Sequence, residues 1–203
     1  MPTEIEYFLA PQSPWTYLGH ARFAALAAKA VAAGARLQIK PMDLGQIFPV
    51  SGGLPLPQRA PQRQAYRLVE LARFAKALGL PLNLHPKFFP VPADDAARLI
   101  ITVAAADGTH QAIDLAGRVL AAVWAQERNI NSDETLAKLL VEAGLSAARW
   151  AESRADDVQQ LYAAHTRRAI DIGIFGAPSY VIDGEIFWGQ DRLDFVERKL
   201  RAP

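Results

Sequence analysis

The chain has 203 residues, 51% of them hydrophobic, so it can bury a core as one domain or as one domain with an insertion. A formal charge of +1 with interspersed acids and bases argues against a nucleic-acid surface, and the lack of cysteine excludes disulfides, a dithiol redox centre and thiolate metal sites. Because no secretory signal and no apolar run of roughly 18 residues is visible, we expect a cytoplasmic protein that does not bind a membrane.

The first elements in chain order predict a β-helix-β unit. Residues 5–9 are β-like, and Pro14 to about Ala33 has the apolar spacing of a helix that Gly34 ends. Residues 35–41 alternate in the manner of a strand. A unit of this length favours parallel pairing of its strands through a right-handed crossover.

A long helical block follows, and strand signals then return. Residues 43–61, rich in proline and glycine, predict a loop. Asp183-Gly184 between two apolar runs predicts a tight hairpin of strands 179–182 and 185–188, followed by a last helix over 191–201. The helices expected between the loop and the hairpin cover residues 62–78, 93–106, 110–128, 132–143 and 154–172.

This order of elements predicts an α/β fold. Two halves of a small sheet flank an all-helical insertion, which is the topology of a thioredoxin-like domain interrupted by a helical domain. We assign residues 1–45 and 173–203 to a discontinuous thioredoxin-like domain and residues 46–172 to the insertion.

Ser13-Pro14-Trp15 marks the start of the first helix. Serine is a strong N-cap and proline is favoured at the first helical position. The serine hydroxyl therefore lies at the positive end of a helix, beside backbone N–H groups that can stabilise an anion. An ordinary helix cap is the alternative interpretation. If the anion is a thiolate, the protein must borrow it, because it has no cysteine. No Gly-x-Ser-x-Gly elbow surrounds Ser13, which argues against a serine hydrolase.

Ala177-Pro178 precedes a strand that must join the sheet. A cis peptide bond here would turn the chain sharply and leave the backbone of Ala177 facing outward. In a thioredoxin-like fold this bond lies beside the start of the first helix, so an extended peptide could pair with the exposed backbone.

The segment from Trp188 to Asp194 joins the hairpin to the last helix. Backbone amides at this helix start suit a carboxylate, and Asp191 could accept hydrogen bonds from an ammonium group. A capped helix with acidic first-turn residues is the alternative. Taken together, the three segments describe a binder of a short peptide with a thiol in its middle, and glutathione meets that description.

Three motifs carry a family resemblance: Ser13-Pro14-Trp15-Thr16-Tyr17-Leu18, Phe175-Gly176-Ala177-Pro178 and Trp188-Gly189-Gln190-Asp191-Arg192-Leu193-Asp194. They resemble the signatures of the 2-hydroxychromene-2-carboxylate isomerases, which belong with the kappa-class glutathione transferases in the DsbA-like thioredoxin superfamily. The resemblance covers essentially the whole chain, including the position and size of the helical insertion.

The resemblance implies roles for several residues. Ser13 would hydrogen-bond the glutathione sulfur, the backbone of Ala177 next to Pro178 would pair with the cysteinyl part, and Gln190 with Asp191 would hold the γ-glutamyl end. Trp188 and Gly189 lie in the same binding segment, and Arg63 replaces a frequent lysine. The substrate-side residues that the resemblance implies are Phe48, Gln58, Arg59 and Phe88, and Trp15 and Tyr17 are candidates to border the acceptor pocket.

The sequence also departs from the family pattern. Ala10-Pro11-Gln12 stands where an aspartate and a phenylalanine are frequent, and Gly52, Gly53 and Leu54 occupy a loop that often has an asparagine. Phe48 lies near a lysine position of the naphthalene-pathway isomerase. These changes leave the thiol site intact and concern the aromatic substrate.

The resemblance implies a glutathione-dependent isomerase that interconverts 2-hydroxychromene-2-carboxylate and trans-o-hydroxybenzylidenepyruvate by reversible thiol addition, in aromatic-compound catabolism and as a homodimer. A kappa-like glutathione transferase and a noncatalytic glutathione- or peptide-binding module are the alternatives. We expect no metal site, because His20, His85, His110 and His165 show no short ligand spacing. Trp124 and Trp150 lie at helical apolar positions and are expected to pack.

Overall fold

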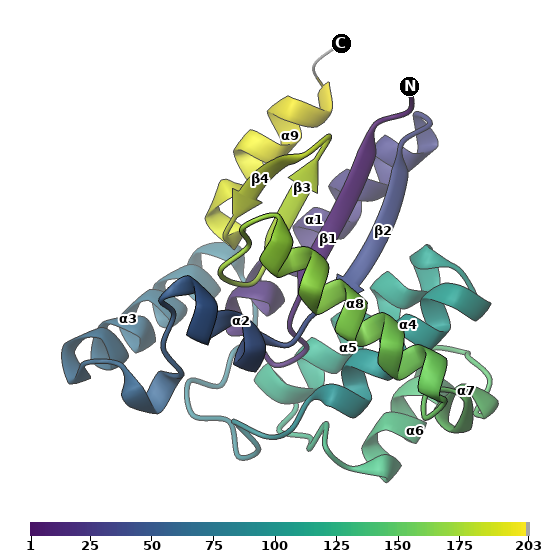
Figure 1. Cartoon of the computed structure of the whole chain (residues 1–203). Coiled ribbons are helices and arrows are strands. Elements are labelled where there is room, and N and C mark those ends of the chain that lie inside the picture. Colours follow the sequence, from purple (N-terminus) through teal and green to yellow (C-terminus); the bar gives the residue numbers. More distant parts are fainter. Residues whose placement is uncertain (202–203) are drawn as a thin grey trace.

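Four strands form one sheet in the order β2-β1-β3-β4 (Figure 1). The strands are β1 (Glu4–Leu9), β2 (Arg36–Pro41), β3 (Ser179–Ile182) and β4 (Glu185–Trp188). A computed structural model describes residues 1–201, so residues 202–203 of the predicted segment 173–203 lie outside the described residues.

The pairing of the strands confirms the predicted fold. β1 and β2 run parallel and are joined by α1 (Pro14–Ala32), whereas β3 pairs antiparallel with both β1 and β4. Asp183 and Gly184 have φ values of 49° and 85°, the left-handed conformation that a two-residue hairpin turn needs.

The side chains of β1 alternate between the two faces of the sheet, and both faces of this strand are covered. Ile5, Tyr7 and Leu9 belong to one hydrophobic cluster together with residues of α1 and of the helical block. Phe8 belongs to a second cluster on the other face, which α8 (Asp156–Asp171) covers in Figure 1. The sheet therefore lies between α1 and α8.

The helical block runs from the end of β2 to the start of β3. Besides α8 and the short 3-10 turn η1 (Leu56–Gln58), its helices are α2 (Leu44–Ser51), α3 (Pro61–Leu78), α4 (Asp94–Ala106), α5 (Thr109–Trp124), α6 (Asp133–Glu142) and α7 (Ala148–Glu152). After β4 the chain forms the 3-10 turn η2 (Gln190–Arg192) and then α9 (Leu193–Arg201).

Four element predictions need correction. The loop predicted over 43–61 contains α2 and η1: Asp43 caps α2 by accepting a hydrogen bond from the Gly45 N–H, and Gly52 ends it in a left-handed conformation. The short helix α7 was not predicted. The helix predicted over 110–128 ends at Trp124, and that over 191–201 divides into η2 and α9.

Residues 1–201 contain neither a membrane-crossing helix nor a cluster of metal-ligating side chains. No helix in that range has both the length and the apolarity needed to cross a bilayer. Within the same range, no three histidine, cysteine or acidic side chains are grouped so that they could hold a metal ion. The ring of His20 is instead fixed in the core, where Nδ1 lies 3.0 Å from the Tyr7 hydroxyl and Nε2 donates to the Ile113 carbonyl over 2.9 Å.

His165 on α8 makes the stability of the fold depend on pH. Burial, and then the positive charge of Lys40, lower the pKa of His165 to about 4, against hydrogen bonding to the backbone of Pro41 and the charge of Glu6. The unfolded histidine titrates near pH 6.5. Between these values the unfolded chain binds a proton that the folded chain does not, so stability falls as the pH is lowered. We expect His165 to account for about 2 kcal/mol of the free energy of unfolding lost between pH 7 and pH 4.5.

Urea unfolding of the protein and of His165→Gln at both pH values measures this contribution. The variant should lose about 2 kcal/mol less than the parent on acidification. His85→Gln is the control, because His85 is exposed, and it should lose as much as the parent. Equal losses in all three proteins would contradict the assignment.

Candidate functional site

Ser13 lies where the start of α1 meets the segment before β3. Its Oγ accepts a hydrogen bond from the Thr16 N–H over 3.2 Å, as an N-cap should, and Pro14 follows at the first helical position. The same hydroxyl donates to the Ala177 carbonyl over 3.4 Å, although the two residues are 164 positions apart. The structure thus brings together the first two sequence motifs.

The backbone around Ser13 and Ala177 keeps free hydrogen-bonding capacity. The Ala177-Pro178 peptide bond is cis, as the sequence analysis anticipated. Among residues 1–201, neither the Ala177 N–H nor the Trp15 N–H in the first turn of α1 has a partner, and the bond from Ser13 to the Ala177 carbonyl is long. An extended peptide can therefore pair with Ala177, and an anion can accept hydrogen bonds from Ser13 and Trp15. These groups fit the cysteinyl part of glutathione.

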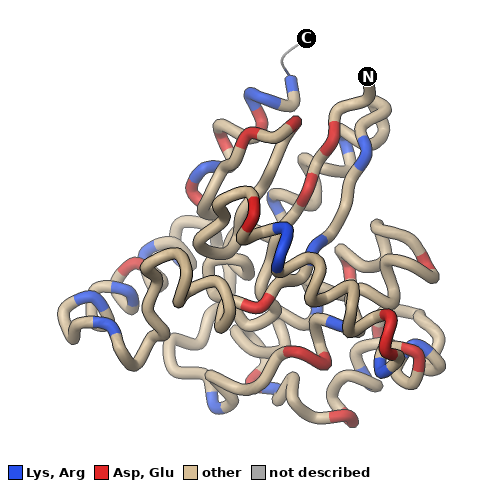
Figure 2. The backbone as a smooth tube through the Cα atoms, viewed as in Figure 1, with Lys and Arg blue, Asp and Glu red and all other residues tan. Residues whose placement is uncertain are grey.

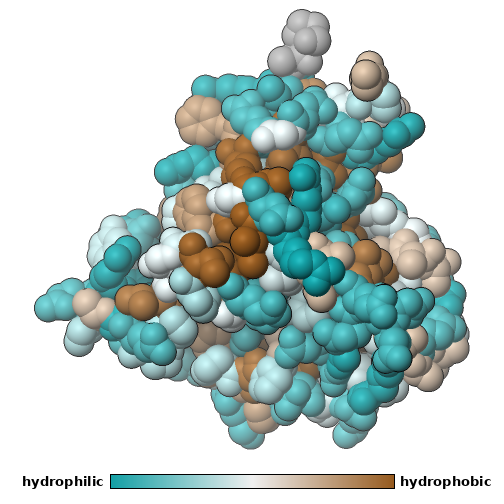
Figure 3. Space-filling view, viewed as in Figure 1, coloured by the Kyte–Doolittle hydropathy of each residue, from teal (hydrophilic) through white to brown (hydrophobic). Residues whose placement is uncertain are grey.

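Ser13 is only 7% exposed, which restricts the approach to its hydroxyl. The neighbouring aromatic pair is open by contrast: Phe175 and Trp188 are 43% and 50% exposed, with ring centroids 4.7 Å apart. Gly176 lets the indole lie against the backbone, since a Cβ there would come within 2.5 Å of Trp188 Nε1. Figure 3 shows apolar surface in the region of β3, β4 and the loop before β3.

The third motif is tied to the second by its backbone. The Gly189 N–H donates to the Pro178 carbonyl over 2.9 Å, and Gly189 has a φ of 107° that favours glycine. Gln190 is buried against α1, where a Cβ on Gly19 would come within 2.8 Å of the Gln190 Cβ. The carboxylate of Asp191 is exposed and lies 2.7 Å from Arg192 Nη1. Asp191 is thus open to a ligand, whereas the side chain of Gln190 is enclosed.

The predicted substrate-side residues fall into separate groups. Phe48 and Arg59 lie together, with the guanidinium 5.8 Å from the ring centroid, whereas Gln58 is exposed. Arg63, which was predicted on the glutathione side, is exposed as well. Phe88 is half-buried, with Lys87 Nζ 5.2 Å from its ring centroid.

Trp15 and Tyr17, the two aromatic residues of the first motif, pack inward. Trp15 meets Phe74 edge to face, and the hydroxyl of the buried Tyr17 donates to the Pro81 carbonyl over 2.6 Å. The structure therefore uses Tyr17 to fix the segment after α3, and its hydroxyl is already occupied.

Sequence reasoning missed Arg67. Its guanidinium lies 5.6 Å from the ring centroid of Phe89 and 5.7 Å from that of Trp124. Trp124 is fully buried, and its Nε1 donates to the carbonyl of Gln12, the residue before Ser13, over 3.2 Å. The four-residue spacing of Arg59, Arg63 and Arg67 could have indicated a shared basic face. The rings that contact Arg67 belong to distant segments of the sequence, so this contact could not be predicted from spacing.

Basic residues dominate α3. Figure 2 shows blue segments along this helix. The one acidic residue in the sequence of α3 is Glu70, which pairs with Arg73. Arg67 has no acidic partner within residues 1–201. Burial and then the charge of Arg59 lower the pKa of Arg67 to about 10, so the side chain stays a cation at neutral pH. The start of α3 thus holds an uncompensated positive charge.

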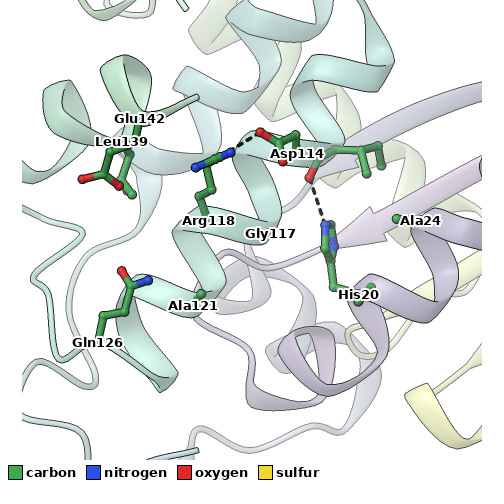
Figure 4. A pocket seen from close by; sticks show the side chains of 11 residues that line it. His20, Ala24, Asp114, Gly117, Arg118, Ala121, Gln126, Leu139 and Glu142 are labelled. Atoms are coloured by element: carbon green, nitrogen blue, oxygen red, sulfur yellow. Dashed lines mark hydrogen bonds and ion pairs between the residues drawn. The ribbon is translucent and has the colours of Figure 1, made fainter. Parts of the chain in front are cut away.

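A cavity of about 330 Å³ opens between α1, α5 and α6, away from these residues (Figure 4). Its ionic groups already have partners: Arg118 Nε lies 2.7 Å from Asp114 Oδ2, and Glu142 pairs with Arg128 over 2.9 Å. The figure also shows the bond from His20 to the Ile113 carbonyl. The cavity therefore offers a ligand no free charge.

Comparisons with known proteins give relatives over nearly the whole chain. The chain is 26% identical to a 2-hydroxychromene-2-carboxylate isomerase of Sphingobium xenophagum over 98% of this chain and 99% of the relative, and 26% identical to one of Pseudomonas putida over 95% and 92%. A solved 2-hydroxychromene-2-carboxylate isomerase superposes with a TM-score of 0.78 at 22% identity, over 96% of this chain and 93% of that one. The cytosolic disulfide reductase DsbM of Pseudomonas aeruginosa with GSH gives 0.68 at 18%, over 98% and 100%.

The relatives confirm the resemblance to the isomerases, and the solved structures confirm the fold. The family model described as a DSBA-like thioredoxin domain matches residues 4–201. The chain therefore belongs to the DSBA-like thioredoxin family.

Proposed function

We propose that this protein is a glutathione-dependent isomerase that interconverts 2-hydroxychromene-2-carboxylate and trans-o-hydroxybenzylidenepyruvate in aromatic-compound catabolism. The observation that carries the proposal is the 3.4 Å contact between the Ser13 hydroxyl and the Ala177 carbonyl, which joins an anion-stabilising helix start to a peptide-binding edge. The proposal includes a cytoplasmic protein that acts as a homodimer, as the family resemblance implies.

The family relationship supports an enzyme with isomerase or thiol-disulfide chemistry. Because the chain has no cysteine, such chemistry needs a thiol from outside. Glutathione, when bound, would supply a sulfur nucleophile that adds reversibly to an unsaturated substrate. The DsbM structure with GSH supports glutathione as that source within this fold.

The residues of this chain have defined parts in the proposed reaction. The Ser13 hydroxyl gives up its long hydrogen bond to the Ala177 carbonyl and donates to the sulfur instead. Together with the Trp15 N–H, it stabilises the thiolate. The backbone of Ala177 aligns the cysteinyl unit of glutathione. Asp191 accepts hydrogen bonds from the ammonium group at the γ-glutamyl end of glutathione. A thiol of ordinary pKa near 8.5 is only a few per cent ionised at pH 7, so a lowering of about two units makes thiolate the main form.

Incubating the protein with 2-hydroxychromene-2-carboxylate, with and without glutathione, and identifying the products by mass spectrometry tests the function. We expect the isomeric benzylidenepyruvate to form only with glutathione, which is recovered unchanged. A stable glutathione adduct would instead indicate a transferase. Binding of glutathione without turnover would indicate a noncatalytic module, and either result would overturn the proposed isomerase.

A further inference from the structure

A second cavity, of about 350 Å³, lies between the first half of α3 and the segment 84–90, and we call it the Arg67 cavity. Its walls are largely apolar, and no acidic side chain contributes to them. Its lining residues include Leu56, Gln64, Arg67, Leu68, Leu84 and Phe89. A ligand in the Arg67 cavity therefore meets hydrocarbon, an aromatic ring and a cation.

The polar groups of this cavity differ in how well they are satisfied. The amide of Gln64 donates to the Arg59 carbonyl over 2.7 Å, so it is already occupied. Arg67 has no hydrogen-bond acceptor and no acidic partner within residues 1–201, and its guanidinium lies near the rings of Phe89 and Trp124. Aromatic faces attract a guanidinium but leave its N–H groups unpaired.

A partly buried cation without a counter-ion is costly, so such a group is a candidate for ligand binding. Arg59 and Arg63 increase the local positive charge, and the only acidic residue of α3, Glu70, pairs with Arg73. The guanidinium of Arg67 lies beside the two rings, and its planar fork can donate two parallel hydrogen bonds to one carboxylate.

The Arg67 cavity is also connected to the thiol site. Arg67 lies over Trp124, and Trp124 donates a hydrogen bond to Gln12, the residue next to Ser13. Gln12 Oε1 in turn accepts from the N–H of Val91, just beyond the segment that forms the cavity wall. The same contacts therefore fix both Ser13 and the wall of the cavity.

We propose that Arg67 is the residue that selects a substrate with a negatively charged group: the apolar part of a planar organic acid packs in the Arg67 cavity and its carboxylate binds the guanidinium. The inference rests on the proposed function, because that function requires a site for the unsaturated substrate and the Arg67 cavity is assigned to it. The inference adds Arg67 as a residue that determines substrate specificity. Arg67 lies outside the three sequence motifs and is positioned against Phe89 and Trp124.

The test compares two probes of one shape, salicylate and the uncharged salicylamide, by calorimetric titration in the absence of glutathione. We expect the protein to bind salicylate about 10- to 100-fold more tightly, as a charge-assisted hydrogen bond allows. Arg67→Leu should abolish this preference, and Arg67→Lys should retain part of it. Arg73→Leu, on the same helix but paired with Glu70, is the matched control and should keep the full preference.

Three outcomes would overturn the inference: equal binding of both probes by the parent protein, a preference that survives in Arg67→Leu, or no binding of either probe. Circular dichroism of each variant shows whether it folds, and the comparison of the two probes on the parent protein does not depend on any variant. Because no glutathione or turnover is involved, a failure here leaves the isomerase assay to be judged on its own result.

Discussion

The variant Ser13→Ala is expected to raise the pKa of the bound glutathione thiol by about two units and to lower the thiolate fraction and turnover at pH 7 about 25-fold. The physical reason is that Ser13 supplies the side-chain donor beside Ala177, and a charge-assisted hydrogen bond to a thiolate is lost with the hydroxyl. Ultraviolet titration of the bound thiolate measures the pKa, and the isomerase assay measures the turnover.

Removing Ser13 also removes a helix cap, so a control for the cap is needed. Ser132 caps α6 in the same way, with its Oγ accepting from the Thr135 N–H over 3.4 Å. Ser132→Ala should reduce stability by about 1 kcal/mol, as loss of such a cap does, and should leave the thiolate titration unchanged. If the titration curve of Ser13→Ala coincided with that of the parent, the role given to Ser13 would be wrong.

The variant Trp124→Ala is expected to lower the free energy of unfolding by about 3–5 kcal/mol. The indole is fully buried, packs against Phe89 with ring centroids 4.7 Å apart, and donates to the Gln12 carbonyl. Its removal leaves a cavity and an unsatisfied carbonyl next to Ser13. Denaturant unfolding of the parent and the variant at pH 7 gives the difference.

Trp150→Ala is the control for the loss of an indole. Trp150 is half-buried on α7, where it has the guanidinium of Arg154 4.3 Å from its ring centroid. We expect a loss of about 1 kcal/mol, since less apolar surface returns to water. Similar losses of the free energy of unfolding in both variants would show that the contacts of Trp124 with Arg67 and Gln12 do not contribute to stability beyond the loss of an indole.

The main features of the fold could be predicted because they depend on local patterns. The alternation along β1, the N-cap at Ser13 and the Asp183-Gly184 turn each specify their element from neighbouring residues. Once the topology was assigned, the meeting of Ser13 with Ala177 followed from it.

The missed features depend on contacts that sequence spacing does not show. α2 contains Pro49, which local rules disfavour, but Ile47 is fully buried and anchors the helix in the cluster beneath α8. Arg67 meets the rings of Phe89 and Trp124 only after the helical block has folded. Such packing overrides local propensity and could not be read from the arginine spacing alone.

The antiparallel pairing of β1 with β3 has a consequence for the kinetics of folding. The hydrogen bond from the Glu4 N–H to Asp183 Oδ1 closes a loop of chain 179 positions long. The entropy of closing so long a flexible loop opposes early pairing, and contacts distant in sequence slow folding. We expect the helical block to acquire structure first, because its helices form from local contacts and shorten the effective distance between the two strands. The contact between Ser13 and Ala177 would then be among the last to form.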